Sequence, residues 1–363
     1  MKIVTVVGAR PQFIKAAVVS RVIDEINESA GATLVDEILV HTGQHYDSNM
    51  SDVFFAQMHI RPPSYNLEVG SASHGKATGM MLARIEDVLL REKPDWVLVY
   101  GDTNSTLAGA LAAAKLHIPV AHVEAGLRSF NRRMPEEVNR IATDHVSDLL
   151  FCPTATAMEN LSNEGLDARS YVVGDVMFDA SQFYRGLAVN ESSILIDLGL
   201  RTHDYVLATC HRAENTDDPA RLRGILQGLA EIASQKHVVL PLHPRTRAAI
   251  ERLGLAEQMG HIEVIVPVSF LDMIRLEEGA AVIVTDSGGV QKEAYFFRVP
   301  CVTLRDETEW TETVTAGWNT LAGADMGAIV DAEANVSRPA DWPAFYGDGR
   351  AGEAILDRLR KAC

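Results

Sequence analysis

The sequence predicts an α/β protein with two Rossmann-like, doubly wound domains that face each other across a cleft. Two patterns indicate this fold class: short apolar runs rich in β-branched residues recur along the 363-residue chain, and helical patterns lie between them. The third observation is size, because a chain of this length with 47% hydrophobic residues can bury more than one core.

The predicted strands fall into two series. The first series comprises 2–7, 37–43, 95–102, 120–125, 149–154 and 171–176. The second series comprises 205–211, 237–243, 262–267, 280–287 and 301–305, with helical patterns such as 221–233 after the strands. Because strands that alternate with helices usually pair in parallel, each series predicts one parallel sheet.

The segment 181–200 has no strand pattern and separates the two series. We therefore expect an N-terminal Rossmann-like domain over 1–180 and a C-terminal Rossmann-like domain over 181–345. The remaining residues, 346–363, end in an amphipathic pattern that predicts one helix. No Pro-rich or Gly/Ser-rich linker lies between the two series, so we expect a hinge to couple the domains closely.

Charge and cysteine usage exclude several classes of function. A formal charge of -16 disfavours binding to nucleic acid or to an anionic membrane surface, since both attract basic proteins. The sequence has no apolar run near the roughly 20 residues of a membrane span, and its start does not resemble a signal peptide. The four cysteines are far apart and form no C-x-x-C pair, so a disulfide framework is not expected and the reducing cytoplasm fits best. No tight spacing of ligand residues indicates a metal site.

Polar residues gather just after the predicted strands of the first domain, where open α/β sheets bind their ligands. Arg10 and Lys15 begin the first helix and could meet a phosphate, or they could be surface charges. Asp102 ends one strand and Glu124 another, although Asp102 could simply cap the next helix. Glu136 follows in PEEVNR, and several carboxylates at one site would suit proton transfer.

In the second domain, TDSGGVQKEA follows an apolar strand and opens a helix. Ser287, Gly288 and Gly289 would present backbone N–H groups to an anion, and Glu293 could accept hydrogen bonds from ribose hydroxyls. An ordinary N-cap followed by a tight turn is the alternative. His211 ends another strand, where a single histidine is more often structural than catalytic.

Seven or more motifs in the same order resemble the non-hydrolysing UDP-N-acetylglucosamine 2-epimerases: VVGARPQFIK, HTGQH, VYGDTNSTLAGALAA, HVEAGLR, PEEVNR, HRAEN, VIVTDSGGVQKEA and RDETEWTE. The resemblance runs from residue 1 to about 317 and resumes at 346–349. It implies a fold similar to the B-type glycosyltransferases, with UDP in the interdomain cleft and the final helix packed on the N-terminal domain. It also implies a homodimer and no metal, nicotinamide or ATP cofactor.

The resemblance also implies a mechanism in which UDP is eliminated to give a 2-acetamidoglucal and is then added back with C2 protonated on the other face. Residue by residue, it implies the catalytic groups Asp102, Glu124, Glu136 and His211, without deciding which carboxylate is base and which is acid. The substrate-binding residues that it implies are Arg10, Lys15, Gln44, Ser287, Gly288, Gly289, Glu293 and Arg305, with uracil near 266–273.

Three departures from the family pattern bear on the substrate. SFNRRM replaces a longer stretch containing S-P-W, GDVMFDA replaces G-N-T-V-x-D-A, and Ser51 stands where activated members carry a second glutamine. They resemble the subgroup that epimerises UDP-2,3-diacetamido-2,3-dideoxyglucuronic acid for bacterial surface polysaccharide. Arg132 and Arg133 would suit a sugar carboxylate, or they could be solvated. UDP-N-acetylglucosamine remains the other substrate, and a hydrolysing epimerase or a metal-independent glycosyltransferase remains the alternative function.

Overall fold

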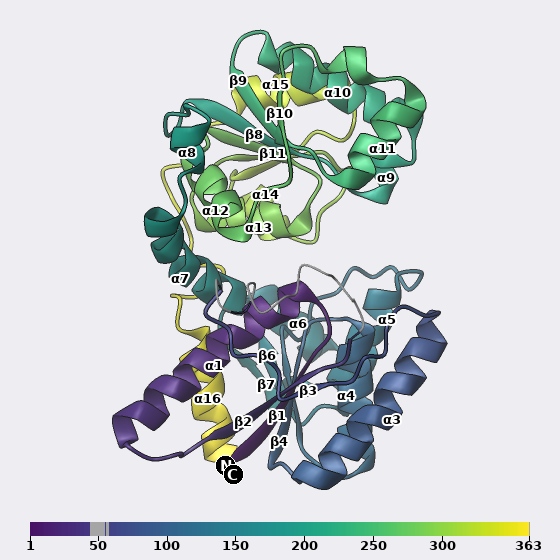
Figure 1. The fold of residues 1–363 in the computed structure, drawn as a ribbon, viewed down its shortest axis with the longest axis vertical. Coiled ribbons are helices and arrows are strands. Elements are labelled where there is room, and N and C mark those ends of the chain that lie inside the picture. The colour runs from purple at the N-terminus through teal and green to yellow at the C-terminus, as the bar shows by residue number, and fades with distance from the viewer. Residues whose placement is uncertain (44–54, 56–57, 363) are drawn as a thin grey trace. The chain divides into compact units, whose positions relative to one another are not determined.

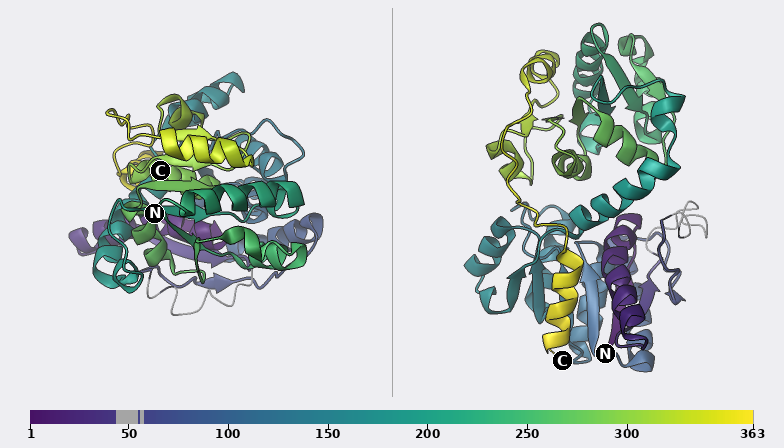
Figure 2. Two further views of the ribbon diagram at one scale, coloured as in Figure 1. Left: turned by 90° about the horizontal axis from the view of Figure 1, so that it is seen from above. Right: turned by 90° about the vertical axis from the view of Figure 1, so that its left-hand side faces the viewer.

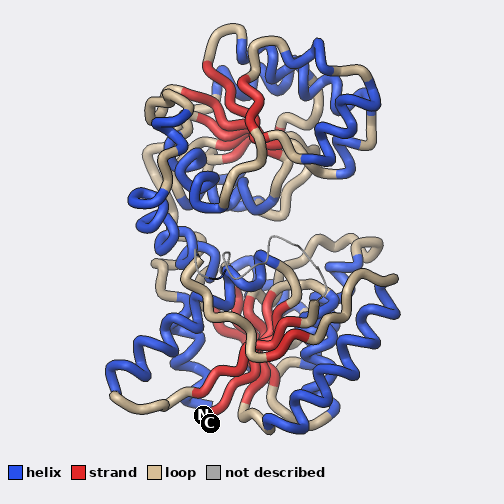
Figure 3. The backbone as a smooth tube through the Cα atoms, in the orientation of Figure 1, coloured by secondary structure: helices blue, strands red, loops and turns tan. Residues whose placement is uncertain are grey.

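The computed structural model describes residues 1–43, 55 and 58–362, which form two compact units (Figure 1). The first unit contains Met1–Ala180 and Ala344–Cys363, and the second contains Ser181–Pro343. In each unit a parallel sheet lies between helices on its two faces (Figure 3). The predicted α/β class with two doubly wound sheets is confirmed.

The first unit is built around a seven-stranded sheet in the order β3-β2-β1-β4-β5-β6-β7. Its strands are β1 (Lys2–Val7), β2 (Asp36–His41), β3 (Tyr65–Asn66), β4 (Trp96–Tyr100), β5 (Val120–Val123), β6 (Leu149–Cys152) and β7 (Ser170–Val172). Its helices are α1 (Arg10–Ala30), α3 (His74–Glu92), α4 (Asn104–Lys115), α5 (Pro135–Val146), α6 (Ala155–Asn163), the 3-10 helix η1 (Asp167–Arg169) and α16 (Ala351–Ala362).

The second unit contains a six-stranded sheet in the order β10-β9-β8-β11-β12-β13. Its strands are β8 (Tyr205–Thr209), β9 (His237–Pro241), β10 (Glu263–Ile265), β11 (Val282–Thr285), β12 (Cys301–Thr303) and β13 (Asn319–Leu321). Its helices are α8 (Ile194–Asp197), α9 (Ala213–Thr216), α10 (Pro219–Ala233), α11 (Pro244–Leu253), η2 (Ala256–Met259), α12 (Phe270–Gly279), α13 (Gly288–Phe296), α14 (Thr311–Thr315) and α15 (Met326–Asn335), while α7 (Val176–Glu191) crosses the boundary between the units.

The predicted strands are all present, and the structure adds two that the sequence did not predict. The central strands β4 and β8 are buried along their whole length, as expected for parallel strands covered on both faces. The two unpredicted strands, β3 and β13, lie at sheet edges and span only two and three residues. Strands this short carry no apolar run that periodicity can detect.

Helices cover both faces of each sheet. In the first unit, α3, α4 and α5 pack side by side, and α1 packs beside α16, as Figures 1 and 2 show. Gly352 at the start of α16 lies so close to α1 that an added Cβ would be 2.9 Å from Val18 Cγ1. In the second unit, α10 packs beside α15, and α12 packs beside α13. Among the described residues, no helix combines the length and hydropathy needed to cross a membrane.

The packing of α10 gives a prediction about stability. A Cβ at Gly224, inside this helix, would lie 2.2 Å from the backbone oxygen of Ala324, so Gly224→Ala must push two backbones apart. We expect it to lower the free energy of unfolding of the second unit by about 1–3 kcal/mol. Gly79, inside α3, is the control: a Cβ there meets no atom within 4 Å, so Gly79→Ala should stabilise the first unit by about 0.5–1 kcal/mol. Equal effects in urea denaturation would contradict the packing argument.

Candidate functional site

The turns after β1 and β4 lie side by side because these two strands pair in the middle of the first sheet. The buried side chain of Gln12 joins them. Its Oε1 accepts hydrogen bonds from the backbone of Gly8 at 2.8 Å and Ala9 at 3.1 Å, and its Nε2 donates to the Tyr100 carbonyl at 2.7 Å. Gln12 therefore fixes the start of α1, including Arg10, against the strand end that carries Asp102.

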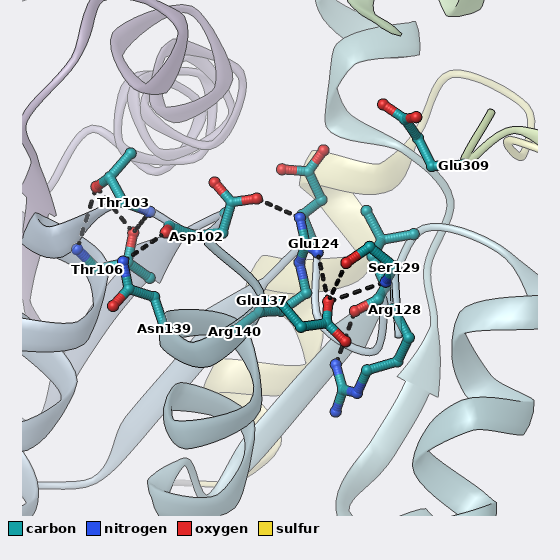
Figure 4. Close-up of polar contacts among 12 residues, drawn as sticks. Asp102, Thr103, Thr106, Glu124, Arg128, Ser129, Glu137, Asn139, Arg140 and Glu309 are labelled. Atoms are coloured by element: carbon teal, nitrogen blue, oxygen red, sulfur yellow. Dashed lines mark hydrogen bonds and ion pairs between the residues drawn. The ribbon is translucent and has the colours of Figure 1, made fainter. Parts of the chain in front are cut away.

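Asp102 is held by an ion pair from α5 rather than used as a helix cap (Figure 4). Its carboxylate accepts from Arg140 Nη2, and its backbone oxygen accepts from Asn139 Nδ2 at 3.0 Å. Thr103, not Asp102, caps α4, since the Thr103 side chain accepts from the backbone N–H of Thr106. The capping alternative for Asp102 is therefore wrong, and its carboxylate is available for another role.

The surroundings of Asp102 favour its protonated form. Burial raises the pKa of Asp102 above its ordinary value, although the Arg140 guanidinium opposes the shift. The negative charges of Glu124 and Glu136 raise it further, so these three predicted residues lie within electrostatic reach of one another. A carboxyl group shifted in this direction is suited to general acid–base chemistry near neutral pH.

Glu124 lies directly after β5 in a left-handed backbone conformation, with φ of 71°. This conformation is uncommon outside glycine, and at functional sites it survives where the surroundings hold it. The Glu124 carboxylate forms an ion pair with Lys15 of α1, whose side chain is only 15% exposed. Gly101 lies beside this pair, since a Cβ there would be 3.2 Å from Glu124 Oε2. Lys15 is therefore not a surface charge.

The loop between β5 and α5 is held by Glu137, a carboxylate that is almost fully buried. Glu137 Oε1 accepts from the backbone N–H of Phe130 at 3.1 Å, and Oε2 accepts from the backbone and hydroxyl of Ser129 at 2.9 and 3.0 Å (Figure 4). Arg140 Nη1 lies 3.5 Å from Oε2, so one guanidinium contacts both Glu137 and Asp102. This loop is thereby connected to the carboxylate at the end of β4.

The residues that this loop presents to solvent include three that the sequence singled out. Arg132, Arg133 and Glu136 are exposed, and Glu136 lies in the first turn of α5, where the helix dipole favours a negative charge. Phe130 at the loop tip is 79% exposed and has φ of 57°. Glu137 therefore fixes an exposed loop whose arginines are accessible to a ligand.

In the second unit, Asp286 joins the ends of β8 and β11. It is fully buried, and its carboxylate accepts from the backbone N–H groups of His211 and Arg212 at 3.0 and 2.9 Å. Asn215 Nδ2 also donates to it at 3.0 Å. The turn carrying His211 is consequently fixed to the turn that opens α13.

The start of α13 contains the N-cap that one interpretation of TDSGG predicts. Ser287 is the N-cap, and its hydroxyl accepts from the backbone N–H of Val290 at 3.4 Å. Gly288 and Gly289 are the first two helical residues, so their N–H groups point out of the helix start, where anions bind. The N-cap therefore leaves the two glycine N–H groups where the anion-binding hypothesis needs them.

Three further residues of the second unit lie near this turn. The His211 side chain is 40% exposed, and its ring centroid lies 5.4 Å from that of His243. His243 Nδ1 accepts from the backbone N–H of Arg245 at 3.1 Å, and burial together with the charge of His211 lowers the pKa of His243. Arg305 is 7% exposed and contacts Glu309 at 2.8 Å.

Glu293, the predicted ribose ligand, lies near a second buried carboxyl group. Glu277 of α12 is 1% exposed, and burial followed by the negative charge of Glu293 raises its pKa well above its ordinary value. Burial and the charge of Glu293 thus both act against ionisation of Glu277.

The structure groups the predicted residues by unit. Arg10, Lys15, Asp102, Glu124 and Glu136 belong to the first unit, and His211, Ser287, Gly288, Gly289, Glu293 and Arg305 belong to the second. Gln44 lies outside the described residues. The described part of the chain contains no group of three or more His, Cys, Asp or Glu side chains arranged to hold a metal ion.

Sequence reasoning missed four residues that hold the site together, namely Gln12, Glu137, Arg140 and Asp286. All four lie inside motifs that were noticed, GARPQF, PEEVNR and TDSGG, so proximity to those motifs was the available signal. Their partners are distant in sequence, and spacing alone did not reveal the contacts.

Two Rossmann-like sheets, one with carboxylates at its central strand ends and the other with a glycine-rich helix start, define a protein of the nucleotide-binding α/β class. The family model described as UDP-N-acetylglucosamine 2-epimerase matches residues 27–360. UDP-2,3-diacetamido-2,3-dideoxy-D-glucuronate 2-epimerase of Pseudomonas aeruginosa is 54% identical, over 99% of this chain and 100% of the relative.

Solved structures agree with the match to the family. The UDP-GlcNAc 2-epimerase of Methanocaldococcus jannaschii, in complex with UDP-GlcNAc and UDP, has a TM-score of 0.87 and 43% identity, covering 99% of this chain and 100% of that chain. The enzyme of Neisseria meningitidis bound to UDP-GlcNAc has a TM-score of 0.87 and 30% identity, with the same coverage of 99% and 100%. The chain belongs to the UDP-N-acetylglucosamine 2-epimerase family and is a nucleotide-sugar epimerase.

The hydrogen bonds that Glu137 accepts give a prediction about the loop between β5 and α5. Glu137→Gln replaces one accepting oxygen with an NH2 group that faces other donors, and leaving such donors unsatisfied costs about 1–3 kcal/mol. We expect the loop to loosen, so that trypsin cleaves after Arg132 and Arg133 several-fold faster than in the unaltered protein.

Glu136→Gln is the matched control for this experiment, because Glu136 is the adjacent residue and is exposed. We expect its cleavage rate and unfolding free energy to stay near those of the unaltered protein, within about 0.5 kcal/mol. Equal cleavage rates for the two variants would show that Glu137 does not hold the loop.

Proposed function

We propose that the protein catalyses non-hydrolysing epimerisation at C2 of UDP-2,3-diacetamido-2,3-dideoxyglucuronate. The relative named for this reaction, with 54% identity over 99% of the chain, is the observation that supports it most directly. The sequence departures around 129–134 point to the same sugar, whose carboxylate distinguishes it from UDP-N-acetylglucosamine. We propose the synthesis of bacterial surface polysaccharide as the role of the product.

The proposed reaction begins with elimination of UDP. A carboxylate removes the C2 proton, the C2–H electron pair forms the C1=C2 double bond, and the C1–O bond breaks with its electrons moving to the diphosphate. UDP then adds back to C1 while an acid delivers a proton to the other face of C2. The sugar keeps its composition, and only the configuration at C2 changes.

The carboxyl groups that we propose for these steps are Asp102, Glu124 and Glu136. Their support is that Asp102 has a raised pKa and that the charges of the other two act on it. Carboxyl groups in different surroundings can be in different protonation states. The reaction requires this, because one group removes a proton and another returns one. We propose that Asp102, Glu124 and Glu136 act on the two faces of C2.

The residues that we propose for the leaving UDP come from both units. The start of α13, with Ser287, Gly288 and Gly289, would hold the diphosphate through backbone N–H groups, and His211 and Arg10 would add donors. Glu293 would accept hydrogen bonds from the ribose, and Arg305 and Gln44 would complete the site. Lys15, paired with Glu124, would approach the phosphate when the substrate replaces that pair.

We also propose a cleft between the units as the place of reaction, a homodimer and a cytoplasmic location. The cleft and the homodimer are what the family resemblance implies. Cytoplasmic location is supported by Cys152, Cys210 and Cys301, which are free and buried.

Solvent exchange tests the proposed reaction. In deuterated water without added metal, we expect UDP-2,3-diacetamido-2,3-dideoxyglucuronate to gain deuterium at C2 and to form its C2 epimer with UDP still attached. Proton NMR measures both changes. Glu136→Gln should lose this exchange and still bind UDP. Release of free sugar and UDP would indicate a hydrolysing epimerase, exchange with UDP-N-acetylglucosamine alone would change the substrate, and absence of exchange with both sugars would refute the proposal.

Substitution of Arg132 and Arg133, on the loop that Glu137 holds, tests which sugar is the substrate. We expect replacement of Arg132 and Arg133 by alanine to raise KM for the uronate about 10-fold or more, because a charged hydrogen bond contributes roughly 1.5–3 kcal/mol. KM for UDP-N-acetylglucosamine, which has no carboxylate, should change far less. Arg360→Ala, an exposed arginine of α16, is the control. An equal effect on both sugars would mean that these arginines do not recognise the carboxylate.

A further inference from the structure

His122 of β5 is a fully buried histidine whose two ring nitrogens both have partners in the first unit. Nδ1 lies 2.7 Å from Asp144 Oδ1, and Nε2 lies 2.7 Å from the backbone oxygen of Gly101. His122 therefore connects the end of β4 to α5 and stands two residues before Glu124.

The hydrogen-bond partner of His122 Nε2 determines whether this nitrogen carries a proton. A backbone carbonyl accepts hydrogen bonds and cannot donate them, so His122 Nε2 must carry a proton. In a neutral imidazole only one nitrogen is protonated, and Nδ1 would then have to accept a hydrogen bond from Asp144. The charge of His122 thus depends on whether Asp144 is protonated.

Asp144 is surrounded by hydrogen-bond donors, which indicates that its carboxyl group is ionised. Its Oδ2 accepts from Arg128 Nη1 at 2.7 Å and from the backbone N–H of Gly126 at 3.2 Å. Burial disfavours the ionised form, but two donors other than His122, the Arg128 guanidinium and the Gly126 N–H, favour it, so the contacts of Oδ2 alone support an ionised Asp144. An ionised Asp144 can only accept from Nδ1, so Nδ1 carries the second proton.

The charges around His122 are balanced. Arg128 also forms a bidentate pair with Glu164, with Nε–Oε1 and Nη2–Oε2 distances of 2.7 and 2.8 Å. Cys152 of β6 is neutral, because burial raises the pKa of its thiol to about 12. Two cations and two anions therefore form this cluster, in which the Glu164 side chain is 27% exposed, and removal of a buried member would leave an unpaired buried charge.

The two hydrogen bonds of His122 also act on the backbone that carries the proposed catalytic carboxylates. Gly101, which precedes Asp102, has φ of 64°, Glu124 has φ of 71° and Gly126 has φ of 81°. His122 bonds to the first of these turns directly and to the last through Asp144. The cluster thus fixes two left-handed turns at neighbouring strand ends.

We propose that His122 is a positioning residue with both ring nitrogens protonated, whose two N–H groups fix the turns that present Asp102 and Glu124. It does not exchange protons with the substrate, because both N–H groups are engaged and the ring is buried. Its role in the reaction rests on the proposed function, whereas its charge does not.

The charge can be tested on the unaltered protein. With 15N-labelled histidine, we expect NMR at pH 7.5 to detect one of the 12 histidine rings with both nitrogens protonated, at a pH where an exposed histidine is mostly neutral. His122→Gln should remove this signal and thereby assign it. Absence of any doubly protonated ring at pH 7.5 would overturn the proposal, whether or not the protein acts on either sugar.

The positioning role can be tested by kinetics with His122→Gln, whose amide has one donating nitrogen instead of two and no charge. We expect kcat to fall about 10-fold or more with little change in KM, and the acid limb of the pH profile of kcat to move to higher pH. The shift follows because Asp102 and Glu124 lose a positive charge that favours their ionised forms.

His261→Gln, a change of an exposed histidine just before β10 in the second unit, is the control and should leave kcat and the pH profile unchanged. A His122→Gln protein that unfolds at lower temperature but keeps the pH profile and kcat of the unaltered protein would show that His122 is structural only. If neither sugar is turned over by the unaltered protein, the proposed function fails and the NMR measurement still decides the charge.

Discussion

Parallel pairing of β1 with β4, and of β8 with β11, is the constraint on which the rest of the protein depends. From each central pair the chain winds outward in both directions, so turns that are distant in sequence open side by side. A buried polar side chain fastens each pair of turns: the Gln12 amide in the first unit and the Asp286 carboxylate in the second. The positions of Arg10, Asp102, His211 and Ser287 all follow from this arrangement.

Charge pairing explains how an acidic protein can be suited to an anionic ligand. Several cations at the strand ends are already matched with carboxylates, as in Lys15 with Glu124, Arg140 with Asp102, and Arg305 with Glu309. Paired cations keep these buried positions stable and still provide donors close to where a diphosphate would bind. Local pairs, rather than the net charge of -16, therefore set the charge close to the strand ends.

Most of the fold could be predicted from the sequence because buried parallel strands are apolar along their whole length. The edge strands β3 and β13 were missed since two or three residues form no detectable pattern. The strand ends were predicted as site positions by the same reasoning. What periodicity could not provide were the contacts between segments, such as Arg140 with Asp102 or His122 with Gly101, which exist only once α5 has packed beside the sheet.

The place of α16 in the first unit makes the second unit an insertion within the first. The chain leaves the first unit after Ala180 and returns to it at Ala344, and α16 then packs on α1 near the start of the sequence. Asp179 accepts a hydrogen bond from the backbone of Gly352 at 3.0 Å, which joins both ends of the insertion. During synthesis the first unit is therefore completed last, after the second unit has emerged whole from the ribosome.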